Sequence, residues 1–230
     1  MRYLNDITSF RGTGQKNEKG QTLEEFLDAY NPKKYDCPSN TADIAVFRKC
    51  TRSAAKDSGG CGLQLLMIRR GNHPNIGYWA LPGGFVNLKE NLETAAAREL
   101  MEETGVTGVP LKMHSTWGDY DRDPRWRVIT TLFFTILEED VPVKAGDDAA
   151  DAAWFDVTLE ETAENADCTC LALRLENAAG GIVLEAAARC SFTGSGILRS
   201  HHLTPESNHG IAGDHALLIM DVARDILAYR

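Results

Sequence analysis

One segment of the chain, GGFVNLKENLETAAARELMEETGV at positions 83–106, joins a glycine pair to a strongly charged helical pattern. The pattern predicts a helix over residues 91–104, with Asn91 as its N-cap and Gly105 ending it in the left-handed conformation that glycine adopts readily. A stripe at helical spacing predicts the face that packs on a sheet: Ala97, Leu100, Met101 and Thr104. Any fold for this chain must therefore hold a glycine turn close to the start of a packed helix.

Three acidic side chains lie on another side of this helix, because Glu99, Glu102 and Glu103 are spaced at i, i+3 and i+4. Like charges on adjacent turns repel each other, and a hard divalent cation bound by carboxylate oxygens would offset that repulsion. Arg98 stands four residues before Glu102, so it can pair with that carboxylate. The alternative is a solvated charged face, which is common on helices.

The register of these residues resembles the Nudix box: Gly, five residues, Glu, seven residues, then Arg-Glu-aliphatic-any-Glu-Glu-any-Gly-aliphatic. The chain supplies every specified position: Gly84, Glu90, Arg98, Glu99, Leu100, Glu102, Glu103, Gly105 and Val106. With this register we interpret the acidic face as a site. The resemblance implies an α/β Nudix fold, in which a mixed β-sheet is sandwiched between helices.

The resemblance also implies roles. Glu99 and Glu103 would be the principal metal ligands, Glu102 would assist, and the carbonyl of Gly83 would add an oxygen. Glu90 would orient its neighbours without touching the metal. The implied cofactor is Mg²⁺, with Mn²⁺ as the alternative, and the implied reaction is attack of water on a diphosphate phosphorus. The implied enzyme is a Nudix pyrophosphohydrolase.

The general base is sought in the acidic loop AGDDAADAAWF at residues 145–155, where related ADP-ribose hydrolases often carry a base or an extra ligand. Asp148 is the candidate, with Asp147 and Asp151 beside it. The alternative is a solvated acidic turn, because aspartate is common in turns.

Four further blocks resemble the ADP-ribose pyrophosphatase branch: residues 69–86, 118–130, 145–157 and 213–227. This resemblance implies a small-molecule nucleotide substrate, ADP-ribose cleaved to AMP and ribose 5-phosphate, and a homodimer. The alternatives are an NDP-sugar, a dinucleoside polyphosphate or an oxidised nucleotide as substrate, or a non-catalytic sensor that binds ADP-ribose. The branch also includes regulators with a winged-helix domain after the Nudix domain, which we expect to be lacking here.

Five residues near these motifs are candidates for substrate binding. Arg70, Arg122 and Arg125 could meet phosphates, since guanidinium matches phosphate oxygens well. For each arginine taken alone, we favour the alternative of surface solvation or a loop ion pair. Trp79 and Phe85 could stack on a base or fill the core, and we favour the core.

The remaining pattern predicts a loose arm and a short helix over residues 1–40, with Thr22 and Glu25 at capping-box spacing. A Nudix domain is expected over 41–230, with an inserted β-hairpin within 158–208. Strands are expected at 41–48, 63–69, 111–117, 127–137 and 153–157, and in the hairpin at 170–176 and 182–190. A final helix is expected over 214–229, with Asp214 as its N-cap.

Charge and composition exclude some classes of protein. The formal net charge of −9 disfavours non-specific nucleic-acid binding, which needs Lys and Arg on phosphates. No apolar run suits a signal peptide or a membrane span, so a cytoplasmic protein without membrane or nucleic-acid partners is expected. The six cysteines lack zinc-site spacing and are expected to be reduced, and His201, His202 and His209 lack a fixed metal spacing.

Overall fold

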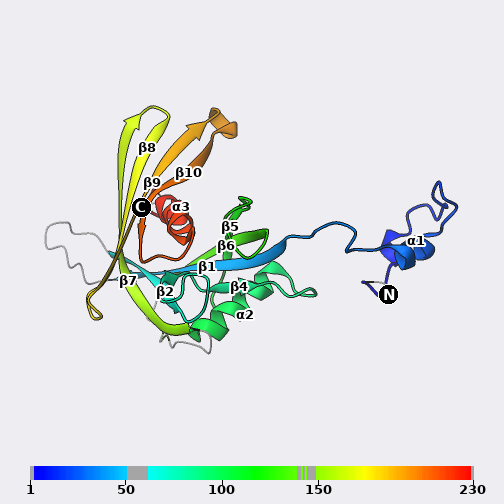
Figure 1. Ribbon diagram of the computed structural model, residues 1–230, viewed down its shortest axis with the longest axis horizontal. Coiled ribbons are helices and arrows are strands. Elements are labelled where there is room, and N and C mark those ends of the chain that lie inside the picture. The colour runs from blue at the N-terminus through cyan, green and yellow to red at the C-terminus, as the bar shows by residue number, and fades with distance from the viewer. Residues whose placement is uncertain (1–2, 51–61, 139–140, 142, 144–148, 229–230) are drawn as a thin grey trace. The chain divides into compact units, whose positions relative to one another are not determined.

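The computed structural model describes residues 3–50, 62–138, 141, 143 and 149–228, and the chain forms two compact units (Figure 1). The first unit, Met1–Cys37, contains a 3₁₀ turn, η1 (Thr8–Phe10), and a short helix, α1 (Leu23–Ala29). Thr22 accepts from the backbone N–H of Glu25, whose side chain accepts from the backbone N–H of Thr22. The predicted capping box is confirmed, and it satisfies two N–H groups that a helix start leaves free.

The second unit, Pro38–Arg230, is built on one mixed sheet (Figure 1). Its described strands are β1 (Ser39–Cys50), β2 (Gly62–Arg70), β3 (Trp79–Ala80), β4 (Gly83–Phe85), β5 (Lys112–Trp117), β6 (Val128–Leu137), β7 (Ala149–Asn165), β8 (Cys168–Asn177), β9 (Ile182–Thr193) and β10 (Ser200–His209). The order is β10-β9-β8-β7-β2-β1-β6-β5, while β3 pairs with β2 and β4 with β1. Only the pairing of β1 with β6 is parallel among these described strands.

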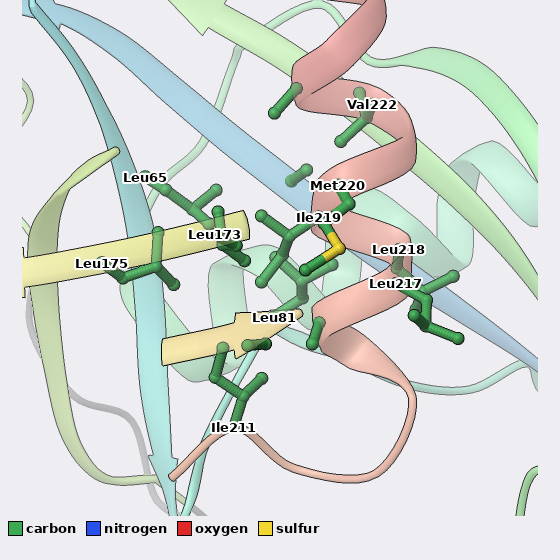
Figure 2. Close-up of a cluster of buried hydrophobic side chains, with 14 of the residues drawn as sticks. Leu65, Leu81, Leu173, Leu175, Ile211, Leu217, Leu218, Ile219, Met220 and Val222 are labelled. Carbon is green, nitrogen blue, oxygen red and sulfur yellow. The ribbon is translucent and has the colours of Figure 1, made fainter. Parts of the chain in front are cut away.

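Two helices cover the two faces of this sheet, α2 (Leu92–Thr104) and α3 (His215–Ala228). Side chains along β1 alternate between them: Ile44 packs in the cluster around Leu100 of α2, and Phe47 in the cluster around α3. Figure 2 shows α3 directing Ile219 and its neighbours toward the sheet. The expected sheet between helices is confirmed. None of the described helices is long and apolar enough to cross a membrane.

Two details of α2 differ from expectation. Asn91 stands at the N-cap, but its side chain forms no capping hydrogen bond. The buried face is Ala95, Ala96, Leu100 and Thr104, whereas Ala97 and Met101 are exposed. The buried face is therefore rotated by part of a turn from the predicted stripe. The row through Ala96 and Leu100 packs on β1, which turns the neighbouring glutamates toward β4.

The segment after residue 150 is more regular than expected. Strand β7 runs for 17 residues. It includes most of the predicted acidic loop 145–155, and it continues beyond the short strand expected at 153–157. Asp151 lies opposite Arg69 of β2, while Asp147 and Asp148 lie outside the described residues. The predicted hairpin is present as β8 and β9, and a further strand, β10, completes it.

These added strands belong to the core. Leu171, Leu173 and Leu175 alternate along β8 with more exposed residues, and they pack in the same cluster as Leu203 of β10 and the apolar face of α3 (Figure 2). Burial of this alternating row explains why the segment continues the sheet. The region 158–208 is thus one wall of the α3 core.

A polar cluster fastens α3 to this wall. The buried carboxylate of Asp221 accepts from Ser115 of β5 at 3.0 Å and lies 2.7 Å from Nε2 of His201 on β10 and 3.3 Å from Nε2 of His114. Burial alone would raise the pKa of Asp221, but its hydrogen bonds to His114 and His201 outweigh burial and hold that pKa well below its usual range. Asp221 in turn raises the pKa of His201 by accepting its hydrogen bond.

We predict that Asp221→Asn lowers the free energy of unfolding by about 3 kcal/mol near pH 6, since it breaks a buried hydrogen-bonded charge pair. The loss should be smaller near pH 9. Stabilisation by charged His201 is complete below its unfolded pKa of about 6.5, and it is lost as the pH rises through the raised folded pKa. Urea denaturation at both pH values measures the difference.

The matched control is His209→Gln, an exposed histidine on the same strand. It should change stability little at either pH, whereas His201→Gln should reproduce the pH-dependent loss. On the acid side, the depressed pKa of Asp221 means that its contribution is present above about pH 4 and falls as the pH drops further. An equal loss at pH 6 and pH 9 in Asp221→Asn would contradict the assignment.

Candidate active site

The glycine pair lets β4 lie closely between β1 and α2. A Cβ on Gly83 would meet the carbonyl oxygen of Ala42 and lie 2.7 Å from Oδ1 of Asp43, both on β1. A Cβ on Gly84 would lie 2.6 Å from the carboxylate of Glu99 on α2. Both distances are too short for a side chain, so the site depends on bare backbone at these two positions.

Arg98 gathers the carboxylates of the helix. Its guanidinium donates to Glu90 at 2.8 and 2.9 Å, to Glu99 at 2.6 Å and to Glu102 at 3.1 Å. It also donates to the carbonyl of Phe85 at 3.0 Å, which ties α2 to the end of β4. The predicted ion pair with Glu102 is confirmed, and hydrogen bonds from Arg98 and Asn87 lower the pKa of Glu90 to about 2.

Glu103 has a different environment. It accepts from the backbone N–H of Gly83 at 2.8 Å, and it forms no ion pair with another described residue. Burial raises the pKa of Glu103 to about 7, and the nearby charges of Glu99 and Asp43 act in the same direction. Glu102 is about half exposed by comparison. The two carboxylates that turn toward the sheet are therefore Glu99 and Glu103.

These carboxylates open onto a cavity of about 510 Å³. The structure brings most of the predicted site residues to its walls: Gly83, Gly84, Glu99, Glu103, Arg98, Arg70, Arg122, Arg125 and Phe85. Glu90 and Glu102 accept hydrogen bonds from Arg98, which itself lines the cavity. Trp79 is not in the lining; it is 5% exposed and packs edge-on against Phe155 in the core. Asp148 lies outside the described residues.

The cavity arginines also have protein partners. Arg122 makes a two-pronged ion pair with Asp214 at 2.8 and 3.1 Å, and Arg125 does the same with Asp123 while its guanidinium lies 5.2 Å from the centre of the Phe85 ring. The predicted N-cap, Asp214, thus directs both carboxylate oxygens to Arg122. These pairs hold the guanidinium groups in fixed positions at the cavity wall.

Sequence reasoning missed Asp43, which lines the cavity from the central strand β1. It is 7% exposed, accepts from the hydroxyl of Thr130 at 2.6 Å, and lies 4.0 Å from Arg122. The signal was present in TADIAVF, because a strand buried on both faces rarely carries a charge without a purpose. A single aspartate without a motif around it did not attract attention.

A second missed residue is His215, at the start of α3 and in the cavity lining. Its Nδ1 accepts from the backbone N–H of Leu81 at 3.0 Å. Such a bond requires Nδ1 to be unprotonated, so Nε2 carries the remaining proton of the neutral ring. The ring therefore joins α3 to the segment just before the glycine pair.

Oxygen donors dominate the cavity beside the glycine pair, which is the chemistry that hard divalent cations prefer. Within the described residues, no three or more His, Cys, Asp or Glu side chains are grouped so as to hold a metal ion by themselves. The oxygen donors beside the glycine pair include Glu99, Glu103 and the carbonyl of Gly83. Mg²⁺ commonly uses few protein ligands and takes water and substrate phosphates for the rest.

The family model of the NUDIX domain matches residues 56–168, which contain the glycine pair and all of α2. The chain therefore contains a NUDIX domain at these residues. The Nudix resemblance seen in the sequence is confirmed.

Two curated Nudix relatives are similar over part of their length. The ADPR responsive transcriptional repressor NtrR of Acinetobacter baylyi is 39% identical over 116 residues, covering 50% of this chain and 43% of the repressor. The ADP-ribose pyrophosphatase of Methanocaldococcus jannaschii is 42% identical over 94 residues, covering 41% of this chain and 55% of the pyrophosphatase. The chain thus spans about half the length of the curated relatives it matches.

A solved Nudix structure extends the similarity beyond the matched domain. The MutT/nudix family protein from Enterococcus faecalis aligns with a TM-score of 0.65 at 27% identity, covering 92% of this chain and 71% of that protein. Coverage this high includes most of the chain after residue 168. Most of the segment that contains β8–β10 and α3 therefore has a counterpart in that MutT/nudix family protein.

Substitution by alanine should destabilise the protein much more at Gly83 than at Gly84. Gly83→Ala should lower the free energy of unfolding by more than about 2 kcal/mol, because its Cβ meets backbone atoms of β1 that cannot move aside. Gly84→Ala should cost less than about 1 kcal/mol, because its Cβ meets only the flexible end of Glu99. Thermal denaturation of both variants measures this, and equal losses would contradict the packing.

Proposed function

We propose that this Nudix protein hydrolyses the diphosphate linkage of a nucleoside diphosphate derivative, with Mg²⁺ as cofactor and ADP-ribose as the leading substrate. AMP and ribose 5-phosphate would be the products. The observation that carries the proposal is a cavity lined both by Glu99 and Glu103 of the Nudix box and by three arginines. Acidic residues for a cation and guanidinium groups for phosphates meet there, as diphosphate chemistry needs.

Glu99, Glu103 and the carbonyl of Gly83 would hold the divalent cation, with Glu102 assisting. Both carboxylates turn toward the glycine pair, and the missing Cβ of Gly84 leaves room for the Glu99 carboxylate. When bound, Mg²⁺ (or Mn²⁺) would polarise phosphoryl oxygens and neutralise developing charge. Arg98 and Glu90 would act as positioning residues, because their paired hydrogen bonds fix the side of α2 that carries the ligands.

Arg70, Arg122 and Arg125 would bind the non-reacting oxygens of the diphosphate. Each guanidinium is already held: Arg70 donates to the carbonyl of Pro74 at 2.7 Å, and the other two are paired with aspartates. Groups that are positioned before the substrate arrives lose little conformational freedom on binding it. Phe85, which is 45% exposed beneath Arg125, would contribute an apolar surface at the cavity mouth.

Asp43 is our proposed general base. Its Oδ2 accepts from Thr130, while its Oδ1 faces the glycine pair beside Glu103. A water molecule between the cation ligands and Asp43 could therefore pass its proton to Oδ1 as it attacks phosphorus. Asp148, expected from the resemblance, remains the alternative.

The first test is incubation with ADP-ribose and Mg²⁺, with and without EDTA, followed by chromatography of the products. AMP and ribose 5-phosphate that form only with the metal would support the proposal. Turnover of NDP-sugars, dinucleoside polyphosphates or oxidised nucleotides instead would keep the reaction class and change the substrate. A folded, metal-loaded protein that hydrolyses none of these compounds would overturn the proposal.

Glu103→Gln should reduce turnover by about 100-fold or more while leaving the melting temperature near that of the wild type, since it removes a ligand charge and keeps the shape. It should also weaken Mn²⁺ binding, which electron paramagnetic resonance measures without any turnover. Glu93→Gln is the matched control, because Glu93 is exposed in the first turn of the same helix. Full activity in Glu103→Gln would remove its assigned role.

Asp43→Asn tests the general base. Turnover should fall by about 100-fold, whereas Mn²⁺ affinity should stay within about threefold of the wild-type value, because a base is not a ligand. Thr130→Val is the companion variant, since it removes only the hydroxyl that orients Asp43 and should give a smaller loss. Loss of Mn²⁺ binding in Asp43→Asn would reassign Asp43 as a metal ligand.

The competing function is a sensor that binds ADP-ribose without cleaving it. It is favoured by the similarity to a repressor named as ADPR responsive. Calorimetry with ADP-ribose distinguishes the two functions: tight binding with no product in the presence of Mg²⁺ would support the sensor. The carboxylates turned toward the glycine pair favour the enzyme, because a sensor has no need for them.

A further inference from the structure

A second cavity, of about 360 Å³, lies beside the first. The connection between β5 and β6 forms it together with β10 and the start of α3, two neighbouring segments much later in the chain. Of these, β10 and the start of α3 lie after residue 168, beyond the part of the chain that the NUDIX family model matches. The fold thus adds a pocket to the cavity that holds the Nudix box.

The floor of this second cavity is apolar. Leu203 and Leu217 are 3% and 8% exposed, and the indole of Trp117 lies with them. The indole N–H donates to the hydroxyl of Ser115 at 3.0 Å, so the ring is held in place. A fixed apolar floor with an aromatic ring fits a flat, weakly polar group.

The charge of the second cavity is mainly negative. Arg122 and Asp214 offset each other as an ion pair, and Asp119 and Asp121 also line the cavity. Such walls repel phosphate and accept hydrogen bonds from hydroxyl or amino groups. The group that fits is therefore uncharged, partly aromatic and rich in hydrogen-bond donors.

The two cavities meet at Arg122, Gly213 and Asp214, which line both of them. If the diphosphate of a ligand lies beside the arginines of the first cavity, a group linked to that diphosphate would lie at this shared wall. Arg122 lies at the boundary, where its guanidinium is within 4.0 Å of Asp43 on one side and is paired with Asp214 on the other. The change from arginine-lined to acidic walls matches the change from phosphate to sugar along such a ligand.

We propose that the second cavity binds the nucleoside end of the diphosphate substrate, with the base on the apolar floor and the ribose hydroxyls and base amino group facing the aspartates. This inference rests on the proposed function of the first cavity. It assigns the other phosphate-linked group, which carries no base, to the far side of the diphosphate. The added strand β10 is then a determinant of substrate specificity.

The test fills the second cavity without touching the Nudix box. Ser207 is exposed on β10 and lines the cavity, so Ser207→Trp places a large side chain in it. Ser195→Trp is the matched control, because Ser195 is exposed in the loop before β10 and lines neither cavity. Calorimetry with AMP and with ribose 5-phosphate, both in Mg²⁺, compares a ligand that has a nucleoside with one that has none.

For Ser207→Trp we expect the Kd of AMP to rise by at least about tenfold and that of ribose 5-phosphate to stay within about twofold. Ser195→Trp should change neither value, and all three proteins should melt at similar temperatures. Unchanged AMP binding in Ser207→Trp would overturn the proposal, as would an equal loss for both ligands. The binding measurement does not depend on turnover. A failure to hydrolyse ADP-ribose would therefore count against the proposed function but not against the binding of the nucleoside in the second cavity.

Discussion

The close approach of β4 to its neighbours is the constraint on which the site depends. Gly83 and Gly84 allow the strand to fit between β1 and α2, where any side chain would collide with backbone or with a carboxylate. This approach lets the N–H of Gly83 reach Glu103 and brings Asp43 beside both. Burying these carboxylates costs free energy, and the packing of α2 on β1 offsets that cost.

The two faces of the sheet position different parts of the site. The face under α2 positions the Nudix carboxylates, and Arg98 keeps them in register through its bonds to Glu90 and to the end of β4. The face under α3 supplies the second half of the cavity through Asp214 and His215. Since Arg122 and the ring of His215 join the two halves, the cavity exists only when both helices are docked on the sheet.

The strands β8–β10 help to position the part of the site that lies on α3. Their buried leucines share a core with α3, so the position of α3 and the wall of the second cavity are set by the same contacts (Figure 2). The Asp221 cluster reinforces this union with hydrogen bonds to β5 and β10. Any change that loosens these strands would shift the start of α3, where Asp214 and His215 stand in the site.

Sequence alone determined the local and periodic features. The Nudix register, the strand pattern, the helix ending at Gly105 and the ion pair of Arg98 with Glu102 depend on spacing within a few residues, which a sequence displays directly. Tertiary structure decided what depends on contacts between distant segments. The rotation of α2, the exposure of Phe85 (expected in the core) and the place of Asp43 beside the glycine pair follow from packing across the sheet, which no local pattern encodes.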